Sequence, residues 1–223
     1  MFNSVICVGG DQMGKIYLTR HGETIWNTEG RLQGWNDSSL TENGVRQAEW
    51  LYERLKEEKI DYIYSSTSGR AYETAKILNK DWGLEIKTSN DLREIGLGEW
   101  QGLNQQELRE KYGEMVDIYW TTPSKYINNS GETFQDVINR TEKFLSNIIK
   151  EHKDHNILVV THTVALKGML LKLEGKELDN IWDEPFIKQT SLTIIDHDGT
   201  NMNIEVHADA SHHKEEYIRN PHY

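Results

Sequence analysis

The chain has a single cysteine, Cys7, among its 223 residues. A framework of intrachain disulfides, on which many small secreted domains depend, is therefore excluded. A lone thiol fits a reducing compartment, so we expect a cytoplasmic protein. The segment Met1 to Val8 agrees, because it has no basic region and too few apolar residues for a secretory signal.

Long hydrophobic runs and an excess of basic charge are also missing. The apolar runs are only a handful of residues long, far short of a membrane span. The 36 acidic side chains outnumber the 25 basic ones, which gives a formal net charge of −11. Because such a surface repels polyphosphate backbones and anionic lipid, we expect neither nucleic acid nor a membrane as a partner. A small phosphate ester stays compatible, since a pocket responds to its local charge.

The length suits one α/β domain with a buried core. Residues 1–14 differ from the rest, because they lack periodicity and contain a Gly-Gly pair. We therefore expect residues 1–14 to be an extension outside the core and residues 15–223 to form a single domain.

Short apolar runs rich in β-branched residues alternate with amphipathic stretches. The runs predict strands at 16–19, 62–64 and 157–161. The amphipathic stretches predict helices over 45–55 and 134–149, the second starting near Ser130 or Thr133. Segments 192–195 and 202–206 predict a hairpin around Asp198-Gly199. The order predicts a three-layer αβα sandwich whose central sheet is mostly parallel with an antiparallel edge.

Polar groups follow three of these predicted strands. They are Arg20-His21, the turn Ser65–Arg70, and His162. Ligands of open α/β sheets bind outside the carboxyl ends of the strands. Parallel strands would bring all three groups to one rim, so the fold predicts one site.

The segment Thr19–Thr24 reads TRHGET. A neutral imidazole such as that of His21 is a competent nucleophile toward phosphorus. The guanidinium of Arg20 offers paired donors that match phosphoryl oxygens. Gly22 lets the backbone turn closely around a bound group. Taken alone, however, the segment is more typical of a polar strand end with a satisfied histidine.

The segment Ser65–Ala71 places small hydroxyl residues and a glycine before a helix. The N-terminal amides of that helix can face an anion, with Arg70 as a second cation. An ordinary helix cap with a surface arginine is the alternative. In Thr161-His162-Thr163, His162 is either structural or, beside the first histidine, a cation over the transferring group.

The segment Leu92–Gly102, LREIGLGEWQG, offers two carboxylates, Glu94 and Glu99. Phosphoryl transfer to water needs one carboxyl group to protonate the leaving oxygen and later to accept a proton from water. Spacing alone does not choose between the two.

Together these segments resemble the histidine phosphatase, or phosphoglycerate mutase-like, superfamily. The run YLTRHGETIWNTEGRLQGWNDSSLTENG resembles its signature, and SSTSGRAYETA, LREIGLGEWQG and VVTHTVALK follow in that family's order and spacing. The resemblance extends from about Lys15 to at least Ile195. The second motif and the run Asp209–His212 are most similar to the broad-specificity phosphatase branch.

The resemblance implies a role for each matching residue. His21 is then the phosphorylated nucleophile, and Glu94 the general acid and base. The phosphoryl oxygens are bound by Arg20, Arg70 and His162, while Asn27 and Gln33 line the pocket. On physical grounds, His21 must be neutral to attack, whereas His162 is most useful when protonated.

One position departs from the family pattern. Many relatives carry a small residue after the second histidine, where this chain has Thr163. Its hydroxyl either adds a donor to the phosphate or caps the following helix, and we favour the cap.

The expected function is that of a metal-independent phosphatase, without cofactor, acting on small phosphate monoesters. A cofactor-dependent phosphoglycerate mutase is the alternative, but it needs extra segments to enclose its product. An inactive binding module is more remote, since every expected reactive residue is present. The oligomeric state stays open.

Other patterns give weaker signals. Gly9–Lys15 has most of a P-loop, but Ile16 replaces the Ser/Thr that would hold magnesium. Tyr119, Trp120 and Tyr126 form either a flap over the leaving group or a core stripe. The other histidines have no convincing metal spacing and are expected on the surface, namely His152, His155, His197, His207, His212, His213 and His222.

Overall fold

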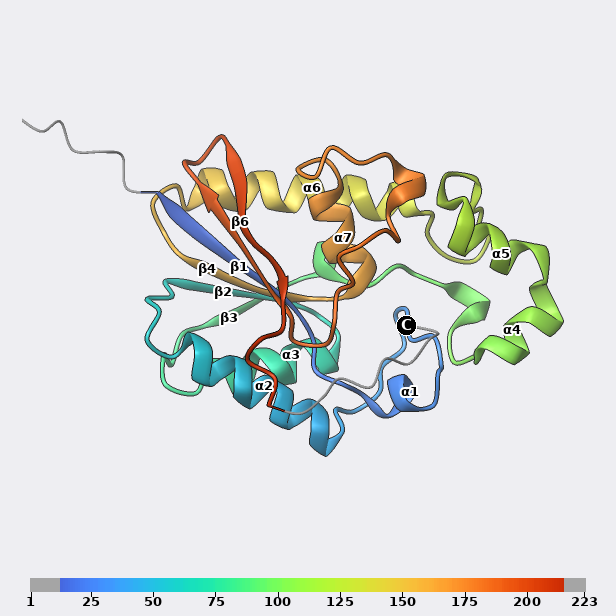
Figure 1. The fold of residues 1–223 in the computed structure, drawn as a ribbon, viewed down its shortest axis with the longest axis horizontal. Helices are drawn as coiled ribbons and strands as arrows, with labels where there is room; N and C mark the ends of the chain where they lie inside the picture. The colour runs from blue at the N-terminus through green and yellow to red at the C-terminus, as the bar shows by residue number, and fades with distance from the viewer. Residues whose placement is uncertain (1–12, 215–223) are drawn as a thin grey trace, which may run out of the picture.

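The computed structural model describes residues 13–214, which form a twisted sheet between two helical layers (Figure 1). Most of the expected N-terminal extension, as well as Cys7 and His222, lies outside these residues. The predicted domain boundaries, residues 15 and 223, therefore stay predictions. The first strand begins at Gly14.

The sheet has six strands in the order β3-β2-β4-β1-β5-β6. Neighbours among β3, β2, β4 and β1 are parallel, whereas β5 pairs antiparallel with β1 and with β6. The strands are β1 (Gly14–Arg20), β2 (Tyr62–Ser66), β3 (Ile86–Ser89), β4 (Ile157–Thr161), β5 (Leu192–His197) and β6 (Met202–Asp209). The predicted fold class and hairpin are confirmed, while β3, a short half-exposed edge strand, is not predicted.

Alternate side chains of the central strands face opposite helical layers, as the pleat requires. Ile16 and Val159 pack on one side with α6 (Phe134–Glu151) and α7 (Thr163–Leu171). Tyr17 and Val160 pack on the other with α2 (Glu42–Leu55) and α3 (Gly69–Leu78). Figure 1 shows these two pairs of helices on either side of the sheet.

The cap of α6 settles which residue begins that helix. The Thr133 hydroxyl accepts a hydrogen bond from the Asp136 amide, and the Asp136 side chain bonds back to the Thr133 amide. Such a reciprocal cap stabilises a helix by about 1 kcal/mol. Thr133, rather than Ser130, is therefore the N-cap.

Shorter elements extend beyond the carboxyl ends of the parallel strands (Figure 1). The α-helices are α1 (Ile25–Thr28), α4 (Gln105–Tyr112) and α5 (Glu114–Thr121), and the 3-10 turns are Asn90–Leu92, Gly98–Trp100, Pro123–Lys125 and Leu178–Asn180. Tyr119 and Tyr126 are buried there in a cluster with Trp100 and Phe134. The core interpretation therefore holds for these two tyrosines.

Two histidines expected on the surface are buried instead. His152 is 4% exposed, and its Nε2 lies 2.8 Å from the hydroxyl of Tyr64. His197 is fully buried, and its Nε2 donates to the carbonyl of His155 at 3.2 Å. The surface prediction is wrong for this pair, because each imidazole finds a polar partner inside. Within residues 13–214 there is no group of three or more potential metal ligands, and none of the helices could cross a membrane.

Acid is expected to weaken the fold partly through His152. Burial lowers the pKa of His152 below its ordinary value of 6.5. Below that pH the unfolded chain binds the proton more readily than the folded one, so the free energy of unfolding falls with the pH. His152→Gln, which can still bond Tyr64, should flatten this fall by up to about 1.4 kcal/mol per pH unit.

Urea unfolding about one pH unit above and one below 6.5 measures the difference between variant and parent. Above 6.5 the histidine is neutral in both states, so the two proteins should respond alike to pH there. If the free energy of unfolding falls with acid as steeply in the variant as in the parent, His152 does not resist protonation in the folded state.

Candidate active site

The register of β1 and β4 brings the two site histidines together. Arg20 pairs with Thr161, and a histidine follows each of these residues. The His21 amide also donates to the Thr161 carbonyl at 3.0 Å. The ring centroids of His21 and His162 are 5.2 Å apart at 61°. The prediction that both lie at one rim is therefore confirmed.

His21 presents its Nε2 lone pair. Its Nδ1 lies 2.7 Å from the carbonyl oxygen of Gly22, which can only accept, so Nδ1 carries the proton. The Arg70 Nε–H donates to His21 Nε2 at 3.3 Å. Burial, followed by the charges of Arg70 and Arg20, holds the pKa of His21 well below its ordinary value. His21 is thus neutral, as its predicted role requires.

Gly22 has a packing role. A Cβ there would lie 2.4 Å from the carbonyl oxygen of Gly44 on α2. Its amide donates to the Thr74 hydroxyl of α3 at 3.1 Å. The glycine lets the loop after His21 press against α2, which is a different use from the predicted turn around a ligand.

Arg70 is buried, and the loop after Gln33 holds it. Its guanidinium donates to the carbonyls of Asn36 and Gly34, at 2.7 and 2.9 Å, and to the Asp37 carboxylate at 3.0 Å. The same carboxylate accepts the backbone amide of Arg70 at 3.3 Å. The interpretation as a surface arginine is wrong. The anion at the start of α3 is the protein's own Asp37.

His162 keeps one nitrogen for a ligand. Its Nε2 lies 2.8 Å from the Ser66 hydroxyl, because β2 and β4 pair with Ser65 beside Val160. Its Nδ1 is buried without a hydrogen-bond partner among the described residues. Burial, then the charges of Arg70 and His21, lowers the pKa of His162 as well. The expected protonated state is therefore not that of the ligand-free site.

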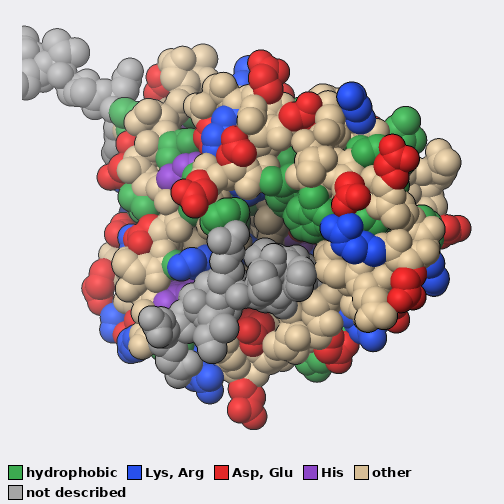
Figure 2. All heavy atoms as spheres, turned by 45° about the vertical axis from the view of Figure 1, so that its right-hand side comes forward, with side chains coloured by type: hydrophobic (Ala, Val, Ile, Leu, Met, Phe, Trp, Pro, Cys, Tyr) green, Lys and Arg blue, Asp and Glu red, His purple; other side chains and the backbone are tan. Residues whose placement is uncertain are grey.

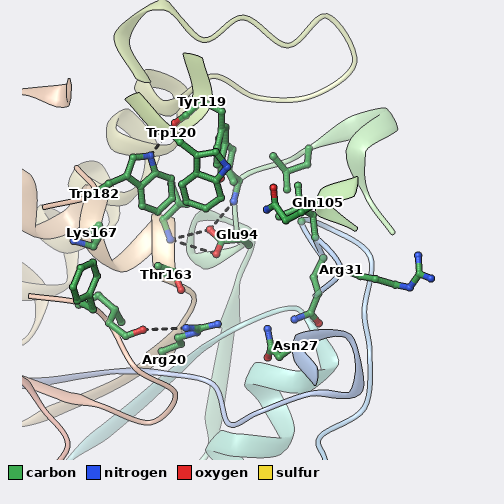
Figure 3. Close-up of a pocket in the computed structure, with 18 of the residues that line it drawn as sticks. Arg20, Asn27, Arg31, Glu94, Gln105, Tyr119, Trp120, Thr163, Lys167 and Trp182 are labelled. Carbon is green, nitrogen blue, oxygen red and sulfur yellow. Dashed lines mark hydrogen bonds between the residues drawn. The ribbon is translucent and has the colours of Figure 1, made fainter. Parts of the chain in front are cut away.

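The structure chooses between the two candidate carboxylates. Glu94 lines a cavity, and its Oε1 accepts the amides of Ile95 at 2.9 Å and of Val164, at the start of α7, at 3.1 Å. Figure 3 shows this carboxylate at the centre of the pocket. Glu99 is exposed and accepts the hydroxyl of Tyr112. Glu94 is the carboxylate at the site.

Thr163 does not cap α7. His162 is the N-cap and Thr163 the first helical residue, without a side-chain cap bond. Its side chain lines the cavity (Figure 3), so the favoured capping interpretation is wrong.

Asn27 and Gln33 are both buried and line the same cavity, as predicted. The Asn27 carbonyl oxygen accepts the amide and hydroxyl of Thr24, at 3.1 and 3.0 Å. These bonds leave the Asn27 amide nitrogen turned toward the pocket (Figure 3). Arg20 is held by a hydrogen bond to the carbonyl of Ile187 at 3.0 Å.

The cavity measures about 970 Å³, far more than one phosphate needs. Its outer part includes residues that the sequence did not single out, such as Arg31, Lys167 and Trp182. The indoles of Trp120 and Trp182 pack with centroids 4.7 Å apart. Figure 2 shows apolar side chains gathered around a hollow on this face. Buried cations and a neutral imidazole at the carboxyl ends of a parallel sheet define the site of an α/β protein that is suited to a small anion.

Comparisons with known proteins agree. The model of the histidine phosphatase superfamily (branch 1) matches residues 16–210. Phosphoserine phosphatase 1 of Hydrogenobacter thermophilus is 37% identical over 170 residues, which cover 76% of this chain and 81% of that protein. A metal-independent phosphoserine phosphatase of Arabidopsis thaliana is 37% identical over 165 residues, covering 73% of this chain and 69% of that protein. The solved structure of Bacillus stearothermophilus YhfR is 41% identical, with a TM-score of 0.87 over 89% of this chain and 98% of that one.

The chain therefore belongs to the histidine phosphatase superfamily, and the resemblance carried by its four motifs is confirmed. It is an enzyme of the phosphoric monoester hydrolase class. Proteins named phosphoglycerate mutase also match the chain, for example one from Schizosaccharomyces pombe at 34% identity over 174 residues.

Proposed function

We propose that the chain is a metal-independent phosphatase that hydrolyses small-molecule phosphate monoesters through a phosphohistidine on His21. The observation that carries this proposal is the neutral imidazole whose Nε2 lone pair lies beside a buried guanidinium. A relative named as metal-independent supports the absence of a metal requirement.

In the first step, His21 Nε2 attacks phosphorus and the bond from phosphorus to the ester oxygen breaks. The leaving oxygen takes a proton from the Glu94 carboxyl group, so the alcohol departs neutral. Arg20, Arg70 and the Nδ1 side of His162 bind the outer phosphoryl oxygens, where charge is concentrated. His162, neutral in the ligand-free site, takes a proton from the solvent when the anion enters.

In the second step, water attacks the phosphohistidine. Glu94, now a carboxylate, takes the proton from the water, and the phosphorus–nitrogen bond breaks to release inorganic phosphate. His21 returns to its neutral form. We assign further phosphate-binding contacts to Asn27, Gln33 and Thr163, which line the same cavity.

The partner of this chain is then a small phosphate ester. The net charge of −11 is the basis for expecting neither nucleic acid nor an anionic membrane surface. The single cysteine supports a cytoplasmic location.

The proposed function is tested by assaying the purified full-length protein in the presence of a chelator. We expect 4-nitrophenyl phosphate to be hydrolysed at the same rate with and without EDTA, because no step uses a metal. Conversion of 3-phosphoglycerate to 2-phosphoglycerate, stimulated by a bisphosphorylated primer and faster than hydrolysis, would favour a mutase instead. Activity in neither assay would leave an inactive binding module.

A further inference from the structure

A partly buried arginine outside the cavity holds the backbone that carries Glu94. Arg140 lies on α6, with its side chain 15% exposed. Its Nη1 donates to the carbonyls of Asp91 and Arg93, both at 2.7 Å, and its Nη2 donates to that of Glu94 at 3.1 Å. Its Nε and Nη2 also donate to the Glu132 carboxylate, both at 2.9 Å. These bonds use all five donors of the guanidinium.

Glu132 also forms hydrogen bonds with the segment that carries Glu94. Its Oε2 accepts the amide of Gly96 at 2.8 Å, and its own amide donates to the Gly96 carbonyl at 2.7 Å. The segment from Asp91 to Gly96 is therefore bonded at four of its residues by one ion pair. The Glu94 carboxylate, on the cavity side, is fixed separately by the start of α7.

The packing of α6 on the rest of the protein does not depend on the Arg140–Glu132 ion pair. The helix already buries eight residues, most of them apolar, against the sheet and α7. Two charges largely removed from water cost free energy unless their hydrogen bonds are complete, and here they are. The planar fork of an arginine can hold three carbonyls at once, whereas a lysine ammonium cannot keep the same geometry.

We propose that Arg140, held by Glu132, is a positioning residue that sets where the Glu94 carboxyl group stands relative to the leaving oxygen. This inference rests on the proposed function, in which Glu94 protonates that oxygen. A shift of about 1 Å in a reacting group can cost about 10²-fold in rate. In kcat/KM, which reports the steps up to release of the alcohol and not the later attack by water, this cost appears only where the leaving group needs a proton.

Two esters with the same ring test this requirement. The phenolate of 4-nitrophenyl phosphate leaves readily without protonation, whereas the alkoxide of 4-nitrobenzyl phosphate does not. In Arg140→Lys we expect kcat/KM to fall about 10²-fold for the benzyl ester and less than about 3-fold for the phenyl ester. Glu94→Gln should show the same selective loss, at least as large.

Glu132→Gln is the second variant, because it keeps one oxygen acceptor near Arg140 but removes the charge. We expect the same selectivity at smaller size, about 10-fold for the benzyl ester. Arg54→Lys, an arginine paired with Asp209 on β6, is the matched control and should leave both esters unaffected. Thermal unfolding of each variant is measured alongside.

Equal losses on both esters, or no loss, in folded variants would overturn the positioning role and leave the proposed function intact. If Arg140→Lys does not fold, the ratio of the two esters in Glu132→Gln decides. A parent protein inactive on both esters would overturn the proposed function itself, together with this inference.

Discussion

Hydrolysis is expected to be lost in His21→Ala, with kcat lower by about 10⁵-fold or more. The variant removes the only atom to which we assign the phosphoryl group, and no other nucleophile in the site is proposed to replace it. Steady-state assay of an aryl phosphate measures the loss. A rapid quench at neutral to alkaline pH followed by mass spectrometry should find one added phosphoryl group in the parent and none in the variant.

The control for this experiment is His155→Ala. His155 is exposed at the opposite ends of the strands and is assigned no part in the reaction. It should keep the parent rate and the parent phosphoryl adduct. Substantial turnover by folded His21→Ala, or an adduct on another residue, would contradict the mechanism.

Arg70→Lys is expected to lower kcat by about 10²- to 10³-fold, the range seen when one donor to a developing anion is removed. The lysine keeps a positive charge, but it loses the fork that bonds Gly34, Asn36 and Asp37 while presenting Nε toward His21. The reacting oxygens then face a poorly placed point charge. Stopped and continuous phosphatase assays measure the change.

Asp37→Asn separates charge from placement. It keeps an oxygen for the Arg70 amide and guanidinium but removes the ion pair. We expect a smaller loss than in Arg70→Lys, and none in Arg54→Lys. An Arg70→Lys protein that turns over at the parent rate would exclude Arg70 from the phosphoryl site.

The parts of the fold that could be predicted are those with a regular apolar pattern, either continuous or repeating. The ILVVT strand is apolar throughout because both faces are covered, and the α6 face repeats every turn. In contrast, β3 is a half-exposed edge with no such pattern. The helices α4 and α5 lie beyond the sheet, where tertiary packing of aromatic residues decides their course.

For the site, the sequence predicts which residues take part but not which way their side chains point. Glu94 and Glu99 lie in a segment without regular periodicity, so spacing alone leaves both open; the family resemblance favours Glu94, and the contact with the start of α7 agrees. Thr163 was misassigned because His162 itself occupies the N-cap position. The carbonyls that Arg140 binds and the arginine that Asp37 binds lie tens of residues away in the sequence, so no local pattern predicts these contacts.

His21 and His162 each follow directly on a central strand, and the hydrogen bond from the His21 amide to the Thr161 carbonyl links the two strand ends. Because both residues are fixed to neighbouring strands, the distance between them should stay constant as long as the sheet is folded. We therefore expect heat to separate these two imidazoles only when the central strands themselves come apart.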